Sequence, residues 1–266
     1  MNAVQLRDRV RFYNDDTRTG RQPLTAFEKA VNDAIGNFTN DIVNQGPQYI
    51  QQNRDNISTL FTVATPAITN GTVITSRYGA SIPMTFTKPT DYRAFSALRM
   101  IVDGISTPVH PADNNEISEF MENLHTMPSN TQAYCIENST GFTIYRGSTA
   151  TVTVSLTYIK KPATYSLGTE GQKISAGAGV LVNGQTYIAL EDDTVQNGVT
   201  YKSGDSFVAV GTNLTAGQVI LSSNTTPCDL PDKTHDIIAR MASTYMLIAI
   251  GEGQKAALVD KGIPKS

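Results

Sequence analysis

The spacing of hydrophobic residues changes along the chain, and each change predicts a different kind of structure. In residues 1–61 they recur every three to four positions, which is typical of amphipathic helices. We expect helices over 3–14, 25–44 and 47–61. Within residues 72–160 the period shortens to two, which predicts strands with one short helix among them. The pattern as a whole predicts an α+β fold.

The predicted second and third helices have recognisable starts. Thr25 and Glu28 stand three residues apart, the spacing of a capping box in which side chains satisfy the first backbone N–H groups. Pro47 suits the first turn of the third helix, where no N–H is needed.

The clearest strand pattern is the alternation that ends before Pro162. Val152, Val154, Leu156 and Tyr158 share one face, while threonines and a serine occupy the other. One face of this strand is therefore expected to be buried and the other exposed or in contact with a partner.

Residues 165–226 differ from their surroundings, because they are rich in Gly, Thr, Asn and Val. Asn183-Gly184 and Asn197-Gly198 predict type I′ turns of β-hairpins. We expect a small all-β module here, inserted through stems at Pro162 and Pro227 into an α+β core made of residues 1–164 and 227–266.

A final helix is expected over 230–250. Asp229 can cap its N-terminus and Pro231 fits its first turn. Its apolar stripe consists of Ile238, Met241, Ala242, Tyr245, Met246 and Ala249. Because no other helix is predicted nearby in sequence, this stripe is expected to pack on the N-terminal helices and on the sheet that ends at Tyr158.

Composition narrows the possible functions. The net charge is -3 and the pI about 5.6, so no basic field over the whole molecule favours nucleic acid or anionic membranes. Cys135 and Cys228 are expected to be buried, reduced thiols. No stretch predicts a signal peptide or a membrane span, so we expect synthesis and residence in a cytoplasm and no membrane partner.

The sequence gives no pattern typical of catalysis. His110, His125 and His235 lack metal-ligand spacing, and no nucleophile-elbow motif is present. The acidic cluster at 191–193 is interpreted as a solvated loop. We therefore predict no catalytic residues, no metal site and no cofactor, and a protein that is not an enzyme.

The order of parts resembles the head-to-tail adaptor or ring proteins of tailed bacteriophages, especially short-tailed phages of the crAss-like group. In that family a strand ending in Tyr and Lys-Pro leads to an Asp-Leu-Pro segment and a helix with an early His. The matching positions here are Tyr158, Lys160, Lys161, Pro162, Asp229, Leu230, Pro231, His235, Ile237, Ile238 and Ala239. The chain departs from the family in that residues 165–226 separate the two halves of this signature.

The resemblance implies a virion protein of the neck or tail. It implies a closed homo-oligomeric ring, typically of twelve copies, which binds the portal protein and adjacent tail or ring proteins and encloses DNA without specific binding. Tail fibres are a further possible partner. The candidate interface residues are Arg7, Arg9, Arg11, Arg18, Arg21, His235 and Arg240.

An alternative function is carbohydrate binding, adhesion or fibre attachment through the β module. Tyr187, Tyr201 and Phe207 would then contact the partner, although the same alternating aromatics fit the core of the module equally well. A glycan-degrading enzyme that uses the acidic cluster ranks last, because no second carboxylate can be placed opposite it.

Overall fold

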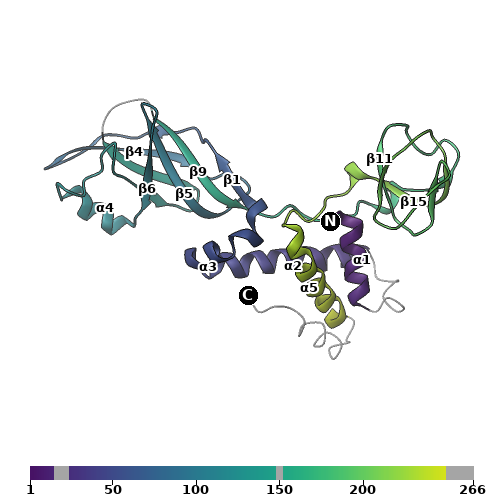
Figure 1. Ribbon diagram of the computed structural model, residues 1–266. Helices are drawn as coiled ribbons and strands as arrows, with labels where there is room; N and C mark the ends of the chain where they lie inside the picture. The colour runs from purple at the N-terminus through teal and green to yellow at the C-terminus, as the bar shows by residue number, and fades with distance from the viewer. Residues whose placement is uncertain (15–23, 148–151, 250–266) are drawn as a thin grey trace. The chain divides into compact units, whose positions relative to one another are not determined.

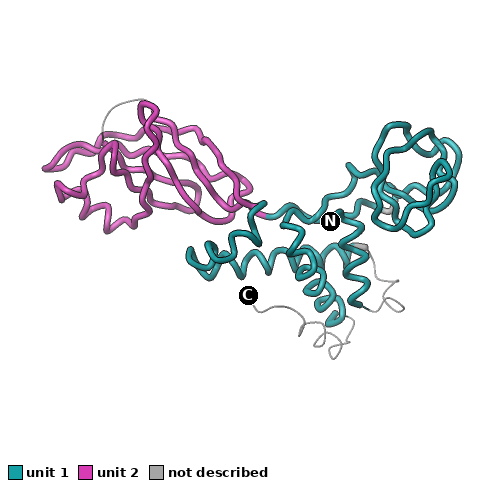
Figure 2. The backbone as a smooth tube through the Cα atoms, in the orientation of Figure 1, with its two compact units in different colours: residues 1–59, 162–266 teal, residues 60–161 magenta. Residues whose placement is uncertain are grey.

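A computed structural model describes residues 1–14, 24–147 and 152–249 (Figure 1). The chain forms an α+β fold of two compact units, coloured separately in Figure 2. Unit 1 comprises residues 1–59 and 162–266, and unit 2 comprises residues 60–161. The units do not follow the predicted domain boundaries: the helices and residues 165–226 share unit 1, whereas the large sheet is a unit of its own.

The helices of unit 1 come from both ends of the described chain. They are α1 (Ala3–Tyr13), α2 (Leu24–Asn44), α3 (Pro47–Gln52) and α5 (His235–Ala249). Helix α5 packs on both α1 and α2, as predicted for the N-terminal helices (Figure 1). Its buried face includes Ile238, Ala242, Met246 and Leu247. Of the apolar stripe expected from the sequence, Ile238, Ala242 and Met246 are buried, Met241 and Tyr245 are half-buried, and Ala249 is exposed.

The prediction of one helix over 47–61 is wrong. Helix α3 ends at Gln52 and is followed by 3₁₀ turns at Arg54–Asn56 and Ser58–Leu60. The Asn53 amide donates to the Tyr49 carbonyl, and the Asn56 amide donates to Asn53 Oδ1. Asparagine side chains that bond nearby polar groups in this way compete with helical hydrogen bonds.

The expected capping box at Thr25 is also wrong. Helix α2 begins at Leu24, so Thr25 lies within it. Glu28 Oε1 instead accepts hydrogen bonds from the Leu167 N–H, at 2.7 Å, and from the Ser166 hydroxyl, at 3.2 Å. The Glu28 carboxylate therefore makes a tertiary contact and does not cap the helix, whereas the local pattern predicts that it would.

Asp229 likewise serves a tertiary contact. A 3₁₀ turn, Asp232–Thr234, precedes α5, and Pro231 rather than Asp229 occupies its capping position. The Asp229 carboxylate accepts a hydrogen bond from the Ala163 N–H at 3.1 Å.

The β module in unit 1 contains short antiparallel strands around its own small core. They are β10 (Lys173–Gly177), β11 (Thr186–Ala189), β12 (Thr194–Gln196), β13 (Val199–Tyr201), β14 (Ser206–Val208) and β15 (Leu214–Leu221). Their order is β13-β12-β15-β11-β14, and β10 pairs with β15. The core of the module includes Leu181, Tyr187, Phe207, Leu214 and Val219.

Only one of the two predicted type I′ turns forms. Asn197 and Gly198 have φ values of 49° and 77°, as a type I′ turn between β12 and β13 requires. At the other site only Gly184 has a positive φ, 81°, and the Gln185 N–H donates to the Val182 carbonyl. This is the type II arrangement. The Asn183 side chain accepts a hydrogen bond from the Gly211 N–H.

Unit 2 is built on one large, mainly antiparallel sheet. Its strands are β1 (Phe61–Ala64), β2 (Thr69–Asn70), β3 (Ile74–Ser76), β4 (Gly79–Thr87), β5 (Tyr92–Val102), β6 (Ile105–Pro111), β7 (Ala133–Glu137), β8 (Gly141–Gly147) and β9 (Val152–Lys160). Their order is β1-β9-β5-β6-β7-β8-β4-β2, and β3 also pairs with β4. Only the β6–β7 pair is parallel among the described strands. Helix α4 (Asn114–Met121) starts with a capping box formed by Asp113 and Glu116.

The core of unit 2 confirms the alternation read from the sequence of β9. Val152, Val154, Leu156 and Tyr158 are all buried, whereas Thr153 between them is exposed. They pack with apolar residues of β4, β5, β7 and β8, among them Met84, Leu98, Met100, Cys135, Phe142 and Ile144.

Replacing Gly217 in β15 should destabilise the β module more than replacing a similar glycine. Gly217 and Gly211 have φ values of 83° and 86°, so an alanine is strained at both. At Gly217 the added Cβ would also lie 2.4 Å from Thr194 Oγ1, whereas at Gly211 nothing lies within 4 Å. We expect Gly217→Ala to cost about 1–3 kcal/mol more than Gly211→Ala in urea unfolding, the range for overpacking. Equal costs would contradict this account.

Candidate interface surfaces

Two of the candidate interface arginines lie together where α1 meets α5. Asp236 Oδ1 accepts hydrogen bonds from Arg9 Nε at 2.9 Å and from the Tyr13 hydroxyl at 2.5 Å. Arg240 Nε donates to Asp236 Oδ2 at 3.1 Å, and its guanidinium lies 5.0 Å from the Tyr13 ring centroid. The cluster joins the two helices and leaves one positive charge in excess.

The electrostatics of this cluster keep Asp236 ionised. Burial raises the pKa of Asp236, but hydrogen bonds from Tyr13 and Arg9 and the charge of Arg240 outweigh it, and the pKa is lowered overall. The Arg9 side chain remains 48% exposed and the Arg240 side chain 30% exposed. The two arginines therefore hold α1 against α5 while keeping donors accessible to a partner.

Arg7 has a different role from its neighbours on α1. Its Nη2 donates to the Leu190 carbonyl at 2.9 Å and to the Ser203 hydroxyl at 3.0 Å, and its Nε donates to Asp8 Oδ1 at 2.8 Å. The residue is buried, so in this chain Arg7 attaches α1 to the β module and is not a surface group. Arg11 is half-buried on α1. Arg18 and Arg21 lie outside the described residues.

His235 was expected at the surface of the last helix, and this expectation is wrong. The residue is 2% exposed. Its Nε2 lies 2.8 Å from the Leu230 carbonyl, which assigns the proton to Nε2, and its Nδ1 lies 3.3 Å from Asp232 Oδ1. Burial lowers the pKa of His235, so the neutral imidazole is favoured. His235 therefore stabilises the turn before α5 and is not an interface residue.

The aromatic residues proposed as module contacts belong to the module core. Tyr187 and Phe207 are 2% and 6% exposed. The Tyr201 ring stacks on Phe207 with a centroid separation of 4.3 Å. The assignment of Tyr187 and Phe207 to a carbohydrate-binding face is therefore wrong, because both side chains are buried in the module, and Tyr201 is half-buried against the same core.

The two stems of the β module meet in space. Ser166 and Thr226 exchange backbone hydrogen bonds of 3.0 and 2.8 Å, beside the Ala163–Asp229 contact. Tyr165, expected in the module, is instead buried in the helical part of unit 1: its hydroxyl donates to the Ala3 carbonyl at 2.6 Å, and Asn32 bonds its backbone. Sequence reasoning missed these contacts because no local pattern connects residues so far apart.

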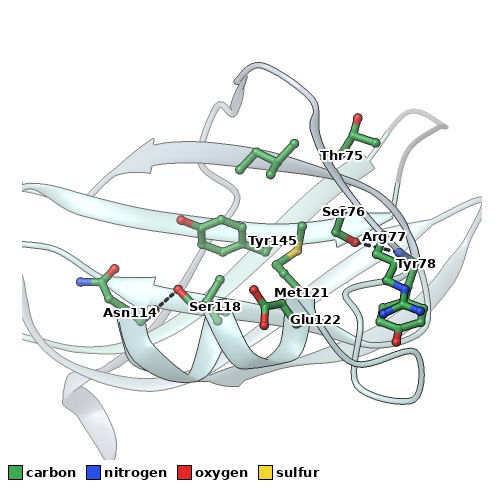
Figure 3. Close-up of a pocket in the computed structure, with 11 residues that line it drawn as sticks. Thr75, Ser76, Arg77, Tyr78, Asn114, Ser118, Met121, Glu122 and Tyr145 are labelled. Atoms are coloured by element: carbon green, nitrogen blue, oxygen red, sulfur yellow. Dashed lines mark hydrogen bonds between the residues drawn. The ribbon is translucent and has the colours of Figure 1, made fainter.

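Unit 2 contains a hollow of about 780 Å³ between the β3–β4 hairpin, helix α4 and strand β8 (Figure 3). Its lining consists of Ile74, Thr75, Ser76, Arg77, Tyr78, Asn114, Ile117, Ser118, Met121, Glu122 and Tyr145. In Figure 3 the Tyr145 ring lies between the α4 side chains and the hairpin residues. No local sequence pattern predicts this hollow, because its walls are far apart along the chain.

The polar groups of the hollow are available to a ligand. Within residues 1–14, 24–147 and 152–249, the carboxylate of Glu122 and the hydroxyl of Tyr145 make no hydrogen bond or ion pair. The Arg77 guanidinium lies 5.5 Å from the Tyr78 ring centroid and has no carboxylate partner among these residues. The cation Arg77 and the anion Glu122 thus both line the hollow but do not form an ion pair with each other.

Other candidate chemistry can be judged from the described part of the chain. There, no three His, Cys, Asp or Glu residues are grouped so that they could hold a metal ion. Cys135 and Cys228 are buried free thiols, as predicted, and burial raises their pKa values to about 12 and about 11. None of the described helices is long and apolar enough to cross a membrane.

Comparison with known protein families and with characterised proteins finds no match to this sequence. The geometry of the chain itself therefore carries the functional interpretation.

Replacing Asp236 should loosen the contact between α1 and α5. Asp236→Asn leaves the charges of Arg9 and Arg240 uncompensated, and we expect it to lower the free energy of unfolding by about 1–2 kcal/mol. The matched control is Asp33→Asn, which breaks only the exposed Lys29–Asp33 pair on α2 and should cost less than about 0.5 kcal/mol. Equal effects of the two variants in urea unfolding would contradict a structural role for Asp236.

His235 should make stability fall on mild acidification. Because burial lowers its pKa in the folded state, the unfolded chain binds more protons below about pH 6.5, so stability is lost as the pH falls. The lowered pKa values of Asp232 and Asp236 add a further loss only near and below about pH 4. In calorimetry between about pH 7.5 and about pH 5, His235→Gln should reduce the fall in Tm. His125→Gln, at an exposed position, should leave it unchanged.

Proposed function

We propose that this chain is a structural protein that assembles into a closed ring at the head-to-tail junction of a bacteriophage particle. The observation that carries the proposal is the contact between Ala163 and Asp229. It brings the residue after the Tyr-Ile-Lys-Lys-Pro segment at 158–162 beside the Asp-Leu-Pro segment that precedes α5. Within unit 1, the residue that follows Pro162 therefore lies beside Asp229, although residues 165–226 separate the two in sequence.

The helical part of unit 1 supports this proposal. Helix α5 packs on α1 and α2, so segments from the two ends of the described chain form one helical bundle. We call these three helices the base. The β module joins this base through the paired stem at Ser166 and Thr226. A base closed in this way can self-associate while the β module contacts a different protein.

The surface of α1 and α5 offers a suitable subunit contact. Phe12 is 73% exposed on α1 and Ile248 is 58% exposed near the end of α5. Arg9 and Arg240 lie on the same pair of helices. Exposed aromatic and arginine side chains are enriched at protein interfaces, and a ring requires a heterologous contact in which this surface meets a different one on the next copy.

The charge of the chain suits a conduit for DNA. A net charge of -3 gives no strong attraction to phosphates, whereas a basic lumen would bind the backbone and resist sliding. The proposed partners are therefore the portal protein, adjacent tail or ring proteins and further copies of this chain, with DNA only passing through.

Quantitative mass spectrometry of purified particles tests the proposal. We expect a copy number equal to that of the portal protein or a small whole multiple of it, and a ring of about twelve copies by native mass spectrometry. Phe12→Asp should weaken assembly with little change in Tm, because the side chain is already exposed. The control Val63→Asp, at a position 65% exposed in unit 2, should leave assembly intact. Absence of the chain from the particle would overturn the proposal.

A further inference from the structure

We propose that the hollow in unit 2 binds an extended peptide segment of another protein, which adds as a strand to the outer edge of β3 and lies between β3 and α4. This proposal concerns unit 2 alone and does not depend on ring assembly. It rests on the backbone geometry of β3, the side chains that line the hollow and the balance of charge within it.

The outer edge of β3 has backbone groups ready to pair with a strand. Among the described strands β3 pairs only with β4, in the register Ser76 with Gly79, Thr75 with Ala80 and Ile74 with Ser81. Ser76 and Gly79 close the two-residue turn, so this pair is hydrogen-bonded. Hydrogen-bonded and non-hydrogen-bonded pairs alternate along an antiparallel ladder, so the next pair, Thr75 and Ala80, is not hydrogen-bonded. The N–H and C=O of Thr75 therefore point away from β4, toward the free edge.

The lining side chains favour a peptide over other ligands. Ile74, Met121 and Tyr145 give one part of the hollow an apolar surface that fits an aliphatic side chain. A sugar would bury hydroxyls against Ile74 and Met121 and could not extend the sheet. An extended peptide can bond the Thr75 backbone and place alternate side chains into the hollow, as in other complexes formed by strand addition.

The charges of the hollow also favour an uncharged or mixed-charge segment. Arg77 and Glu122 are its only ionised lining residues, so they cancel in net charge. Neither has an ion-pair partner in the described part of the chain. A nucleic acid or a strongly acidic peptide would gain no net attraction, because Glu122 repels the anion that Arg77 attracts, whereas a peptide of little net charge meets no such conflict.

The test is selection of a displayed library of random peptides, roughly ten residues long, on the full-length protein. Enriched peptides should all carry an aliphatic residue at the same position of the aligned sequences. One of them is then synthesised, and its binding is titrated by fluorescence polarisation. Thr75→Pro removes the outward N–H and should weaken binding by at least about tenfold, because a backbone pair is lost. Thr75→Ala keeps that N–H and should bind within about twofold of the unchanged protein.

A second pair of variants tests the opposite wall on α4. Ser118 lines the hollow and Glu119 does not, although both are exposed. Ser118→Trp should fill the hollow and weaken binding by at least about tenfold, while Glu119→Trp should leave it unchanged. This pair decides the outcome if the Tm of Thr75→Pro shows that the variant is unfolded.

Three results would overturn the proposal. One is the failure of any peptide to enrich on the protein relative to Ser118→Trp. Another is equal peptide binding by Ser118→Trp and Glu119→Trp. The last is a glycan array on which the protein binds a neutral glycan but no peptide binds to it. If Ser118→Trp abolished that glycan binding, the hollow would be assigned to a sugar. None of these results bears on ring assembly, which is measured by copy number.

Discussion

The packing of α5 against α1 and α2 is the contact on which unit 1 depends. It buries the apolar stripe of α5, including Ile238, Ala242 and Met246, against helices from the opposite end of the chain. Burial of such a stripe supplies most of the stability of a helix in a protein, since a short isolated helix is marginal in water. The chain that connects α2 to α5 must therefore begin and end at this helical contact.

Buried polar contacts then determine how the β module joins the base. Arg7, Glu28, Asn32 and Tyr165 each lie at least partly buried with a partner distant in sequence. A buried polar group without a partner costs free energy, so these hydrogen bonds select one arrangement among several that hydrophobic packing alone would permit. They also explain why residues that look like surface groups in the sequence are structural in the folded chain.

The surfaces that remain available have different chemistry in the two units. Unit 1 exposes Phe12 and the partly exposed arginines of the Asp236 cluster, which suits contacts between large rigid bodies. Unit 2 has a hollow beside an edge strand, which suits a single extended segment. A structural protein that assembles with several partners would use both kinds of surface.

The sequence by itself determined the α+β class, the helix periods, the buried face of β9 and the two buried thiols, because each follows from local spacing or residue type. The tertiary structure decided the role of individual polar residues. Glu28 and Asp229 match capping patterns but bond to distant backbone groups, His235 is buried rather than exposed, and Tyr187 packs inside the β module. It also decided the hollow of unit 2. Local propensity is worth only fractions of a kcal/mol per residue, so a buried tertiary hydrogen bond or a packed ring overrides it.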